Sequence, residues 1–171
     1  MARYVAFLRG VSPMNAKMPE LLRCFERAGF SEVKTLLSSG NVVFTARTQS
    51  AARLERTAEA AMVKHLARKF YTIVRPVEAL QKLIAADPFG SFALPAKAKR
   101  VVTFLREPRE PAQPLPVEQA GARILAMDGR EIFTAYIPSP KGPVFMTLIE
   151  RTFGSDVTTR TWETLTKCAQ A

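Results

Sequence analysis

Three short stretches of this sequence combine hydrogen-bond donors with cationic side chains, which suits the binding of a negatively charged group. The first follows an apolar run and precedes a helix-like segment; it contains Arg9, Gly10, Ser12, Asn15 and Lys17. Backbone N–H groups at a helix start attract anions, Arg9 can bind a phosphate or carboxylate with two hydrogen bonds, and Lys17 adds a point charge. The stretch has neither the Walker spacing nor G-x-G-x-x-G. In the alternative interpretation, Arg9 pairs with a carboxylate such as Glu32 and Gly10 only turns the chain.

The second stretch is Ser38-Ser39-Gly40-Asn41, which lies between two strand-like runs. The Ser39 hydroxyl and the Asn41 amide can bind a phosphate or the edge of a base. Serine and asparagine in turns more often satisfy their own backbone, and we favour that role. In the strand order expected below, this turn lies at the opposite end of the sheet from the first stretch, so we do not expect the two to form one site.

The third stretch precedes and enters the last helix-like segment; its candidate residues are Thr159, Arg160, Trp162 and Lys167. Hydroxyl groups and an arginine at a helix start can hold an anion, and an indole can stack on a base or another ring. Trp162 also shares a helical face with Leu165 and Cys168, which favours a place in the core. Arg160 can instead pair with a neighbouring acidic side chain.

Residues that acid–base, nucleophilic or metal chemistry requires are scattered along the chain. The carboxylates show no paired spacing, His65 is the single histidine, and Cys24 and Cys168 match no metal or redox spacing. Cys24 falls in the apolar stripe of a helix, which predicts a buried structural thiol, and His65 is predicted at the boundary of a helical stripe. We therefore assign no catalytic residue, metal or cofactor, and whether the chain is an enzyme stays open.

Residues 1–75 are predicted to form a β-α-β-β-α-β unit, the ferredoxin-like order. The strands are expected at residues 3–9, 32–37, 41–46 and 70–74, and the helices at 19–28 and 50–69. Apolar residues at helical spacing define the first helix: Leu21, Cys24, Phe25 and Ala28. Pro19 and Gly29 suit its two ends, Ser50 suits the start of the second helix, and Gly40 suits a hairpin turn with positive φ.

A helix over residues 76–86 is expected to lead into a second half of similar order. Strands are predicted at residues 100–105, 122–127 and 130–137, with a short last one at 157–159. One helix is expected to start near Pro143, and Thr161 is expected to cap the last helix. Four prolines keep residues 107–116 out of a sheet interior and predict an extended loop. The fold class is therefore α+β, with two ferredoxin-like halves, a linking helix and a C-terminal helix. The expected division is residues 1–75, 76–99 and 100–171.

The charge is unevenly distributed. The net charge is +10, and residues 1–75 carry 13 Lys and Arg against five Asp and Glu, whereas residues 76–171 carry 12 against 10. A basic half favours an anionic partner, and a solvated basic surface is the alternative. No apolar run is long enough to span a bilayer, and the first one is too short for a signal peptide. We expect a cytoplasmic protein without a membrane partner.

Several motifs together resemble a known family. They are YVAFLRGV, KMPEL, AGF and SSGNVVF in the first half, then PKGP before a helix and TTRTW followed by T-x-x-K. This set is similar to the domain-of-unknown-function 1697 family (DUF1697) of mainly bacterial proteins, over nearly the whole chain. The resemblance implies an α+β fold with ferredoxin-like halves and no particular reaction. Residues 11–16 lack the paired glycines common in the family, which weakens the case for an anion loop built from backbone N–H groups.

The leading functional hypothesis is a binding protein for an anionic partner, nucleic acid or nucleotide. Its charge would come from Arg9, Lys17, Arg160 and Lys167. An RNA-recognition module that stacks bases on Tyr4, Phe7 or Phe44 is less favoured, because the aromatic pattern is poor. The alternatives are an enzyme acting on a small phosphorylated or carboxylated metabolite between the halves, and an accessory protein-interaction module. The oligomeric state is not predicted.

Overall fold

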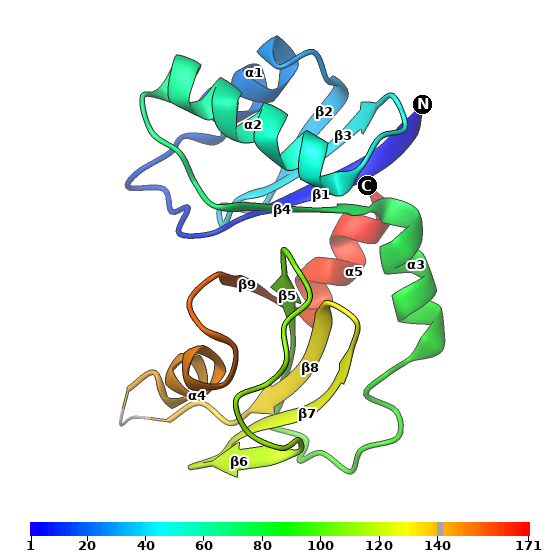
Figure 1. Ribbon diagram of the computed structural model, residues 1–171, viewed down its shortest axis with the longest axis vertical. Coiled ribbons are helices and arrows are strands. Elements are labelled where there is room, and N and C mark those ends of the chain that lie inside the picture. The colour runs from blue at the N-terminus through cyan, green and yellow to red at the C-terminus, as the bar shows by residue number, and fades with distance from the viewer. Residues whose placement is uncertain (140–141) are drawn as a thin grey trace. The chain divides into compact units, whose positions relative to one another are not determined.

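A computed structural model describes residues 1–139 and 142–171 of the chain, so Pro140 and Lys141 of the PKGP motif lie outside the described residues. The chain forms two compact units: unit 1 contains residues 1–85 and 166–171, and unit 2 contains residues 86–165 (Figure 1). The described residues form two antiparallel sheets and five helices, which confirms the α+β class.

Unit 1 follows the predicted β-α-β-β-α-β order and then adds a helix. Its elements are β1 (Ala2–Leu8), α1 (Met18–Arg27), β2 (Ser31–Leu36), β3 (Asn41–Ala46), α2 (Ala51–Leu66), β4 (Thr72–Pro76) and α3 (Val77–Ala86). The sheet order is β2-β3-β1-β4, with every neighbouring pair antiparallel. This is the ferredoxin-like arrangement that the sequence predicts.

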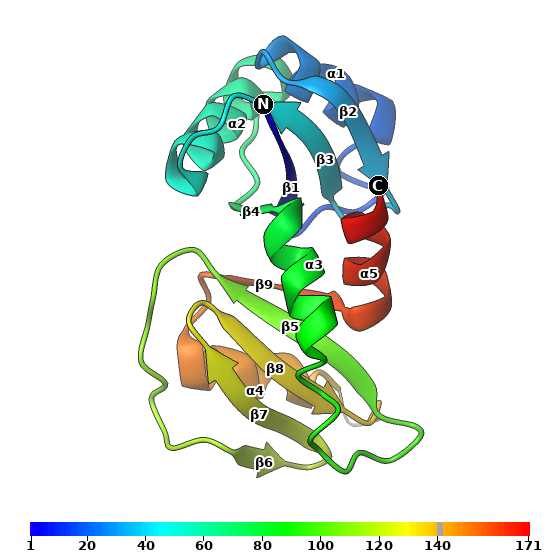
Figure 2. The ribbon, with the colours of Figure 1, turned by 90° about the vertical axis from the view of Figure 1, so that its right-hand side faces the viewer.

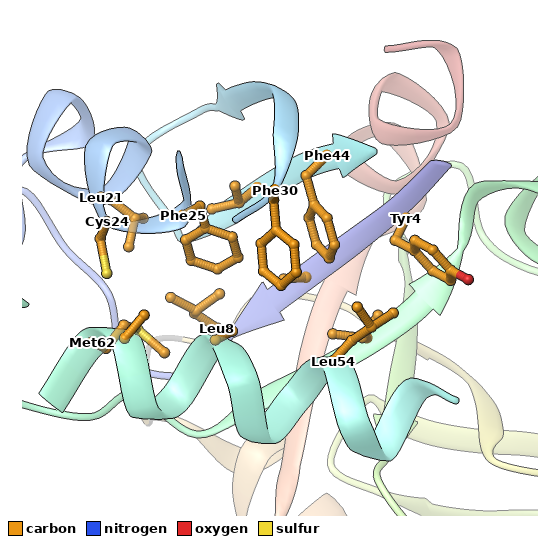
Figure 3. Close-up of a cluster of buried hydrophobic side chains, with 14 of the residues drawn as sticks. Tyr4, Leu8, Leu21, Cys24, Phe25, Phe30, Phe44, Leu54 and Met62 are labelled. Atoms are coloured by element: carbon orange, nitrogen blue, oxygen red, sulfur yellow. The ribbon is translucent and has the colours of Figure 1, made fainter. Parts of the chain in front are cut away.

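The core of unit 1 lies between its sheet and the helices α1 and α2. Figure 3 shows the side chains that fill it, including Leu21 and Phe25 of α1 and Leu54 and Met62 of α2. The Phe30 and Phe44 rings stack with centroids 4.3 Å apart. Alternation along the strands turns Tyr4 and Phe44 toward this core, and Phe7 is also fully buried. Base stacking on these three rings is therefore excluded.

Local signals set the helix ends. Pro19 lies in the first turn of α1, and Gly29 follows the helix with φ +97°. The Ser50 side chain accepts a hydrogen bond from the Arg53 backbone N–H, which caps α2 as predicted. The predicted extension of α2 to residue 69 is wrong, because Ala67 adopts a left-handed conformation with φ +55° and ends the helix.

Two buried carboxylates of α2 protect the edge strand β4. The Glu55 carboxylate accepts from the Val74 backbone N–H at 2.9 Å, and the Glu59 carboxylate accepts from the Thr72 N–H at 3.1 Å. These N–H groups would otherwise be open on the edge of the sheet. The strand occupies Thr72–Pro76, two residues later than predicted.

The antiparallel pairing of β1 with β3 places the hairpin turn at the other end of the sheet from the one expected. Phe7 lies opposite Asn41, and the Leu8 N–H donates to the Gly40 carbonyl at 2.9 Å. A Cβ added at Gly40 would lie 2.9 Å from Val11 Cβ. The turn and the loop after β1 therefore lie side by side, and the expectation that they occupy opposite ends of the sheet is wrong. Residues 9–17, 37–40 and 67–71 make up this end of unit 1.

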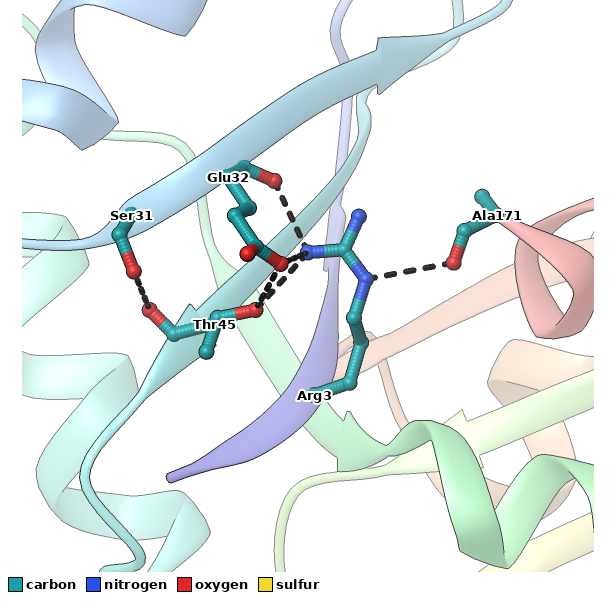
Figure 4. Close-up of polar contacts among 5 residues, drawn as sticks. All are labelled: Arg3, Ser31, Glu32, Thr45 and Ala171. Atoms are coloured by element: carbon teal, nitrogen blue, oxygen red, sulfur yellow. Dashed lines mark hydrogen bonds and ion pairs between the residues drawn. The ribbon is translucent and has the colours of Figure 1, made fainter.

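Glu32 interacts with Arg3 rather than with Arg9 (Figure 4). The Arg3 Nη1 donates to the Glu32 carbonyl at 2.8 Å and lies 3.9 Å from the Glu32 carboxylate. It also donates to Thr45 Oγ1 at 3.1 Å, and Arg3 Nε donates to the Ala171 carbonyl at 3.2 Å. The proposed pairing of Arg9 with Glu32 is therefore wrong.

Unit 2 has the same strand order with one strand added. Its elements are β5 (Lys99–Leu105), β6 (Val117–Gln119), β7 (Ala122–Asp128), β8 (Glu131–Tyr136), α4 (Val144–Phe153) and β9 (Val157–Thr161). The order β6-β7-β8-β5-β9 reproduces the unit 1 sheet beyond β6, and Figure 2 shows β7, β8 and β5 side by side. The proline-rich segment stands where unit 1 has α1, and α4 packs on the sheet through Leu148, Ile149 and Phe153.

The last helix, α5 (Trp162–Gln170), begins in unit 2 and ends in unit 1. The Thr161 side chain accepts from the Thr164 backbone N–H at 3.2 Å, which confirms the predicted cap. In unit 1, Gln81 Nε2 of α3 donates to the Ala169 carbonyl of α5. Within the described ranges, none of the helices has the length and apolar character that crossing a membrane requires.

We predict that Gly40→Ala lowers the free energy of unfolding by about 1–3 kcal/mol more than Gly10→Ala. Both glycines have similar positive φ values, +88° and +82°, so the backbone cost of alanine is matched. Only the Gly40 substitution places a methyl group against Val11 and Leu8, whereas nothing lies within 4 Å of the added Cβ at Gly10. Urea unfolding of the two variants measures the difference, and equal losses would contradict the close approach.

Candidate functional site

The loop after β1 is organised by Asn15. Its Nδ2 donates to the Gly10 carbonyl at 2.8 Å, and its Oδ1 accepts from the Ser12 backbone N–H at 2.9 Å. The Ser12 hydroxyl accepts from the Met14 N–H at 3.3 Å. The polar side chains of Ser12 and Asn15 thus fix the path of the loop and bring Lys17 to the start of α1.

A cavity of about 370 Å³ opens beside this loop. It is bounded by the loop, by α1 and by the end of α2, and its lining residues are Asn15, Ala16, Lys17, Glu20, Arg23, Cys24, Arg27, His65, Leu66 and Arg68. We call it the unit 1 cavity. Of the predicted first-stretch residues, Asn15 and Lys17 line it, whereas Arg9, Gly10 and Ser12 are not among its lining residues.

The charge of the unit 1 cavity is strongly positive. Lys17, Arg23, Arg27 and Arg68 are exposed cations in the lining, against one carboxylate, Glu20. Within residues 1–139 and 142–171, neither Lys17 nor the two arginines of α1 form an ion pair. The Arg68 guanidinium lies over the Phe70 ring, 4.6 Å from its centroid. The cationic charge is therefore available to an anion from solution.

Sequence reasoning misses most of these cations, because they become neighbours only when helices pack. Arg23 and Arg27 lie four residues apart on α1, so they project on the same side of the helix. His65 and Arg68 come from the end of α2, about 40 residues away along the chain. A local signal did exist in the sequence KHLARK, which places four cations or potential cations within residues 64–69.

The N-terminus of α1 adds partial positive charge to the same cavity. Lys17, the residue that precedes the helix, offers no side-chain acceptor for the first-turn N–H groups. These groups and the helix dipole attract negative charge. Asn15, Ala16 and Lys17 place that helix start in the cavity wall.

Cys24 forms part of the cavity wall but is 1% exposed. Burial raises the pKa of its thiol, and the nearby Arg27 guanidinium only partly offsets this by lowering it. A buried thiol with a raised pKa stays protonated near neutral pH and is a poor nucleophile. The predicted structural role of Cys24 agrees with both observations.

The second predicted stretch has a structural role in the hairpin turn. Asn41 is fully buried, and its Nδ2 donates to the Leu36 carbonyl at 2.9 Å and to the Ser39 hydroxyl at 3.0 Å. Gly40 has the positive φ expected of the turn. The favoured interpretation, in which these side chains satisfy their own turn, agrees with this geometry.

The third predicted stretch lies largely within β9, which ends directly before the start of α5. Arg160 is 7% exposed, and its Nη1 donates to Thr158 Oγ1 at 2.8 Å and to the Thr159 carbonyl at 2.7 Å. Thr159 and Arg160 therefore precede the helix as predicted, but the Arg160 guanidinium binds groups of its own strand. Trp162 is half-buried and begins α5, whereas Lys167 is exposed on the same helix. Arg9 belongs to unit 1 and Arg160 to unit 2.

The described residues contain no group of three or more His, Cys, Asp or Glu side chains placed to hold a metal ion. The unit 1 cavity has two such residues besides Glu20, namely Cys24 and His65. Its lining is instead dominated by guanidinium and ammonium groups, which bind phosphates and carboxylates.

Comparisons with known proteins identify a family and a fold. The model of a family described as "Protein of unknown function (DUF1697)" matches residues 1–133. A solved structure of the conserved bacterial protein SP0830 from Streptococcus pneumoniae superposes with a TM-score of 0.73 at 20% identity, covering 99% of this chain and 97% of that chain. At this identity the similarity establishes the fold alone. No curated protein matches the chain.

We predict that the stability of the protein falls less steeply above about pH 8.5 in Cys24→Ala than in the wild type. The raised pKa means that folded Cys24 keeps its proton at a pH where the unfolded chain loses it. This contribution is complete below the unfolded pKa and is lost as the pH rises through the folded pKa. Urea unfolding at pH 7.5 and pH 10 measures it. An equal loss of stability in both proteins would contradict the prediction.

Proposed function

We propose that this chain, which belongs to the DUF1697 family, is a binding protein for an anionic partner and that the unit 1 cavity holds the partner's phosphate groups. The partner we favour is nucleic acid. The observation that supports this most directly is the set of exposed cations in one cavity wall, opposed by Glu20 alone. A hollow lined by one sign of charge concentrates the field and attracts ions of opposite charge.

The lining of the cavity favours recognition of phosphates over recognition of bases. None of the described residues that line it is Phe, Tyr or Trp, and the His65 imidazole is the one ring in its wall. Arg23 and Arg27 can each bind a phosphate with two hydrogen bonds, and Lys17 acts as a point charge. Contacts of this kind position a protein on nucleic acid without reading its sequence.

The positive surface extends beyond the cavity, as a polyanion would require. Lys64 and Lys69 are exposed and flank the lining residues His65 and Arg68 in the sequence. Residues 1–75, which include the whole lining, carry eight more cationic than anionic side chains. A chain of phosphates can contact several of these cations in succession, whereas a single small anion cannot.

We predict that Arg23→Ala/Arg27→Ala weakens nucleic acid binding and makes it less dependent on salt. Each cation that contacts a phosphate contributes about one to the slope of log affinity against log salt. The double variant should therefore reduce this slope by about two. Fluorescence anisotropy with a labelled single-stranded oligonucleotide and a labelled duplex, at about 50 to 200 mM salt, measures the effect.

Arg53→Ala/Arg56→Ala is the matched control for this experiment. It removes the same charge from exposed positions of α2 that lie outside the cavity lining. Only cations that contact phosphates release counterions, so the control should keep nearly the wild-type slope. Both variants should retain the thermal stability of the wild type, because the substituted side chains are exposed. Equal losses of binding in the two variants would refute a defined site in the cavity.

A second candidate function is binding, and then turnover, of a small phosphorylated or carboxylated metabolite. The observation that favours it is the size of the cavity, about 370 Å³, which lies within the usual range for small-molecule sites. Calorimetry with ribose 5-phosphate tests this candidate. Saturable binding that is lost in Arg23→Ala/Arg27→Ala, together with no binding of oligonucleotides, would favour it over nucleic acid.

A further inference from the structure

Unit 2 contains a separate cavity whose geometry does not depend on the function proposed for unit 1. Its volume is about 440 Å³, and its lining residues are Leu94, Pro95, Ala96, Ala98, Lys99, Arg100, Thr161, Trp162 and Glu163. The antiparallel pairing of β5 with β9 places Val101 opposite Thr161. The start of β5 and the start of α5 therefore meet at one end of the sheet, and we call this hollow the unit 2 cavity.

Two adjacent cations lie in the wall of the unit 2 cavity. Lys99 and Arg100 are exposed, and neither forms an ion pair within the part of the chain that the structure describes. Glu163 is the single carboxylate in the lining. The net charge of the lining is therefore positive, and the guanidinium of Arg100 can hold a phosphate or carboxylate with two hydrogen bonds.

An aromatic ring held in place by its neighbours forms another part of the wall. The Trp162 indole is half-buried and meets the Phe89 ring edge-on, with centroids 5.2 Å apart and an interplanar angle of 75°. Phe89 is 1% exposed and makes a second edge contact with Phe133 at 5.9 Å. An indole fixed in this way can accept a planar ring without losing much conformational freedom.

The remaining wall is apolar and is shaped by a turn. Leu94, Pro95, Ala96 and Ala98 supply it. The Ala98 N–H donates to the Pro95 carbonyl at 3.0 Å and closes this turn, and Arg123 Nη1 donates to the Ala93 carbonyl at 3.4 Å beside it. The unit 2 cavity thus combines an apolar wall, an indole ring and two cations, whereas the lining of the unit 1 cavity contains no Phe, Tyr or Trp.

We propose that the unit 2 cavity binds a small ligand that joins a planar aromatic ring to an anionic group, of the nucleoside phosphate class. Trp162 and the apolar wall receive the ring, and Lys99 and Arg100 receive the phosphate. Stacking on an aromatic side chain tolerates any base, because every base has a π-face. Binding therefore depends on having both a ring and a charge on one ligand rather than on the identity of the base.

Trp162 allows this proposal to be tested directly, because it is the only tryptophan in the chain. Intrinsic fluorescence is followed while each of the four common ribonucleoside monophosphates is added to the full-length protein. Adenosine supplies the ring without the charge, and ribose 5-phosphate supplies the charge without the ring. We expect a saturable change with the nucleotides and at least about ten-fold weaker binding of the two partial ligands.

Three variants test whether the nucleotides bind in the unit 2 cavity. Lys99→Ala/Arg100→Ala should weaken nucleotide binding by about ten-fold or more, since it removes charge-assisted hydrogen bonds. Lys97→Ala removes a neighbouring exposed cation that does not line the cavity and should bind as the wild type does. Arg23→Ala/Arg27→Ala, which alters the unit 1 cavity, should also leave the fluorescence titration unchanged, so this proposal and the proposed function fail separately.

Several results would overturn the assignment. One is the absence of any saturable fluorescence change with all four nucleotides, together with no heat of binding in calorimetry. Another is nucleotide binding that Lys99→Ala/Arg100→Ala leaves intact, or that Lys97→Ala weakens equally. A Trp162 fluorescence change that saturates with ribose 5-phosphate at the same concentrations as with the nucleotides would also overturn it, because the ring would then have no part in binding at this cavity.

Discussion

Antiparallel pairing of β1 with β3 determines where the charged groups of unit 1 can meet. Because Phe7 lies opposite Asn41, the end of β1 and the start of β3 occupy one end of the sheet. The loop that leads to α1 begins there, and the chain that leaves α2 returns there to enter β4, where the Arg9 N–H donates to the Tyr71 carbonyl. The start of one helix and the end of another are thus brought to the same cavity.

The strand order also explains why the charge stays available to a ligand. The two buried acids of α2, Glu55 and Glu59, bind backbone N–H groups of β4. Glu32, another acid of unit 1, lies beside Arg3 and Thr45. Three of the five acidic side chains in residues 1–75 are therefore engaged away from the cavity, and the basic excess of this half is left facing solvent.

Unit 2 repeats the strand order of unit 1, but the cavity beside its sheet has a different lining. The β5–β9 pair of unit 2 corresponds to the β1–β4 pair of unit 1. In unit 1 the loop from the end of β1 leads to the start of α1, whereas in unit 2 the start of β5 lies near the start of α5. The proline-rich segment takes the place of the first helix, so the described residues of unit 2 form no helix pair like α1 and α2. Lys99 and Arg100 line the same cavity as Trp162. Within one chain, two sheets of the same strand order thus adjoin cavities with different linings.

Features that depend on local chemistry could be predicted from the sequence. Apolar periodicity located the helices, Ser50 and Pro19 marked helix starts, and Gly40 marked the hairpin. Features that depend on pairing between distant segments could not be predicted from the sequence. A single alanine, Ala67, ends α2 in a left-handed conformation that its side chain does not favour. No local sequence pattern predicts this helix end.

The residues of the candidate site also divide into those that a local sequence pattern predicts and those that depend on tertiary packing. Lys17 and Asn15 were predicted because they adjoin a helix start in the sequence. Arg23 and Arg27 line the cavity only because the end of α2 packs beside α1. Arg160 was assigned to a helix start, whereas strand pairing with β5 extends β9 through it and buries its side chain. Helix crossing and strand extension are both set by tertiary packing.

The unit 1 cavity is the proposed contact between this protein and a negatively charged partner. The most direct test is a two-dimensional NMR titration of the ¹⁵N-labelled protein with a short single-stranded oligonucleotide. We expect the largest chemical-shift changes on backbone amides of residues 15–27 and 65–68, with the rest of unit 1 little affected. Changes spread evenly over the basic residues of the chain, or gathered away from α1 and the end of α2, would contradict it.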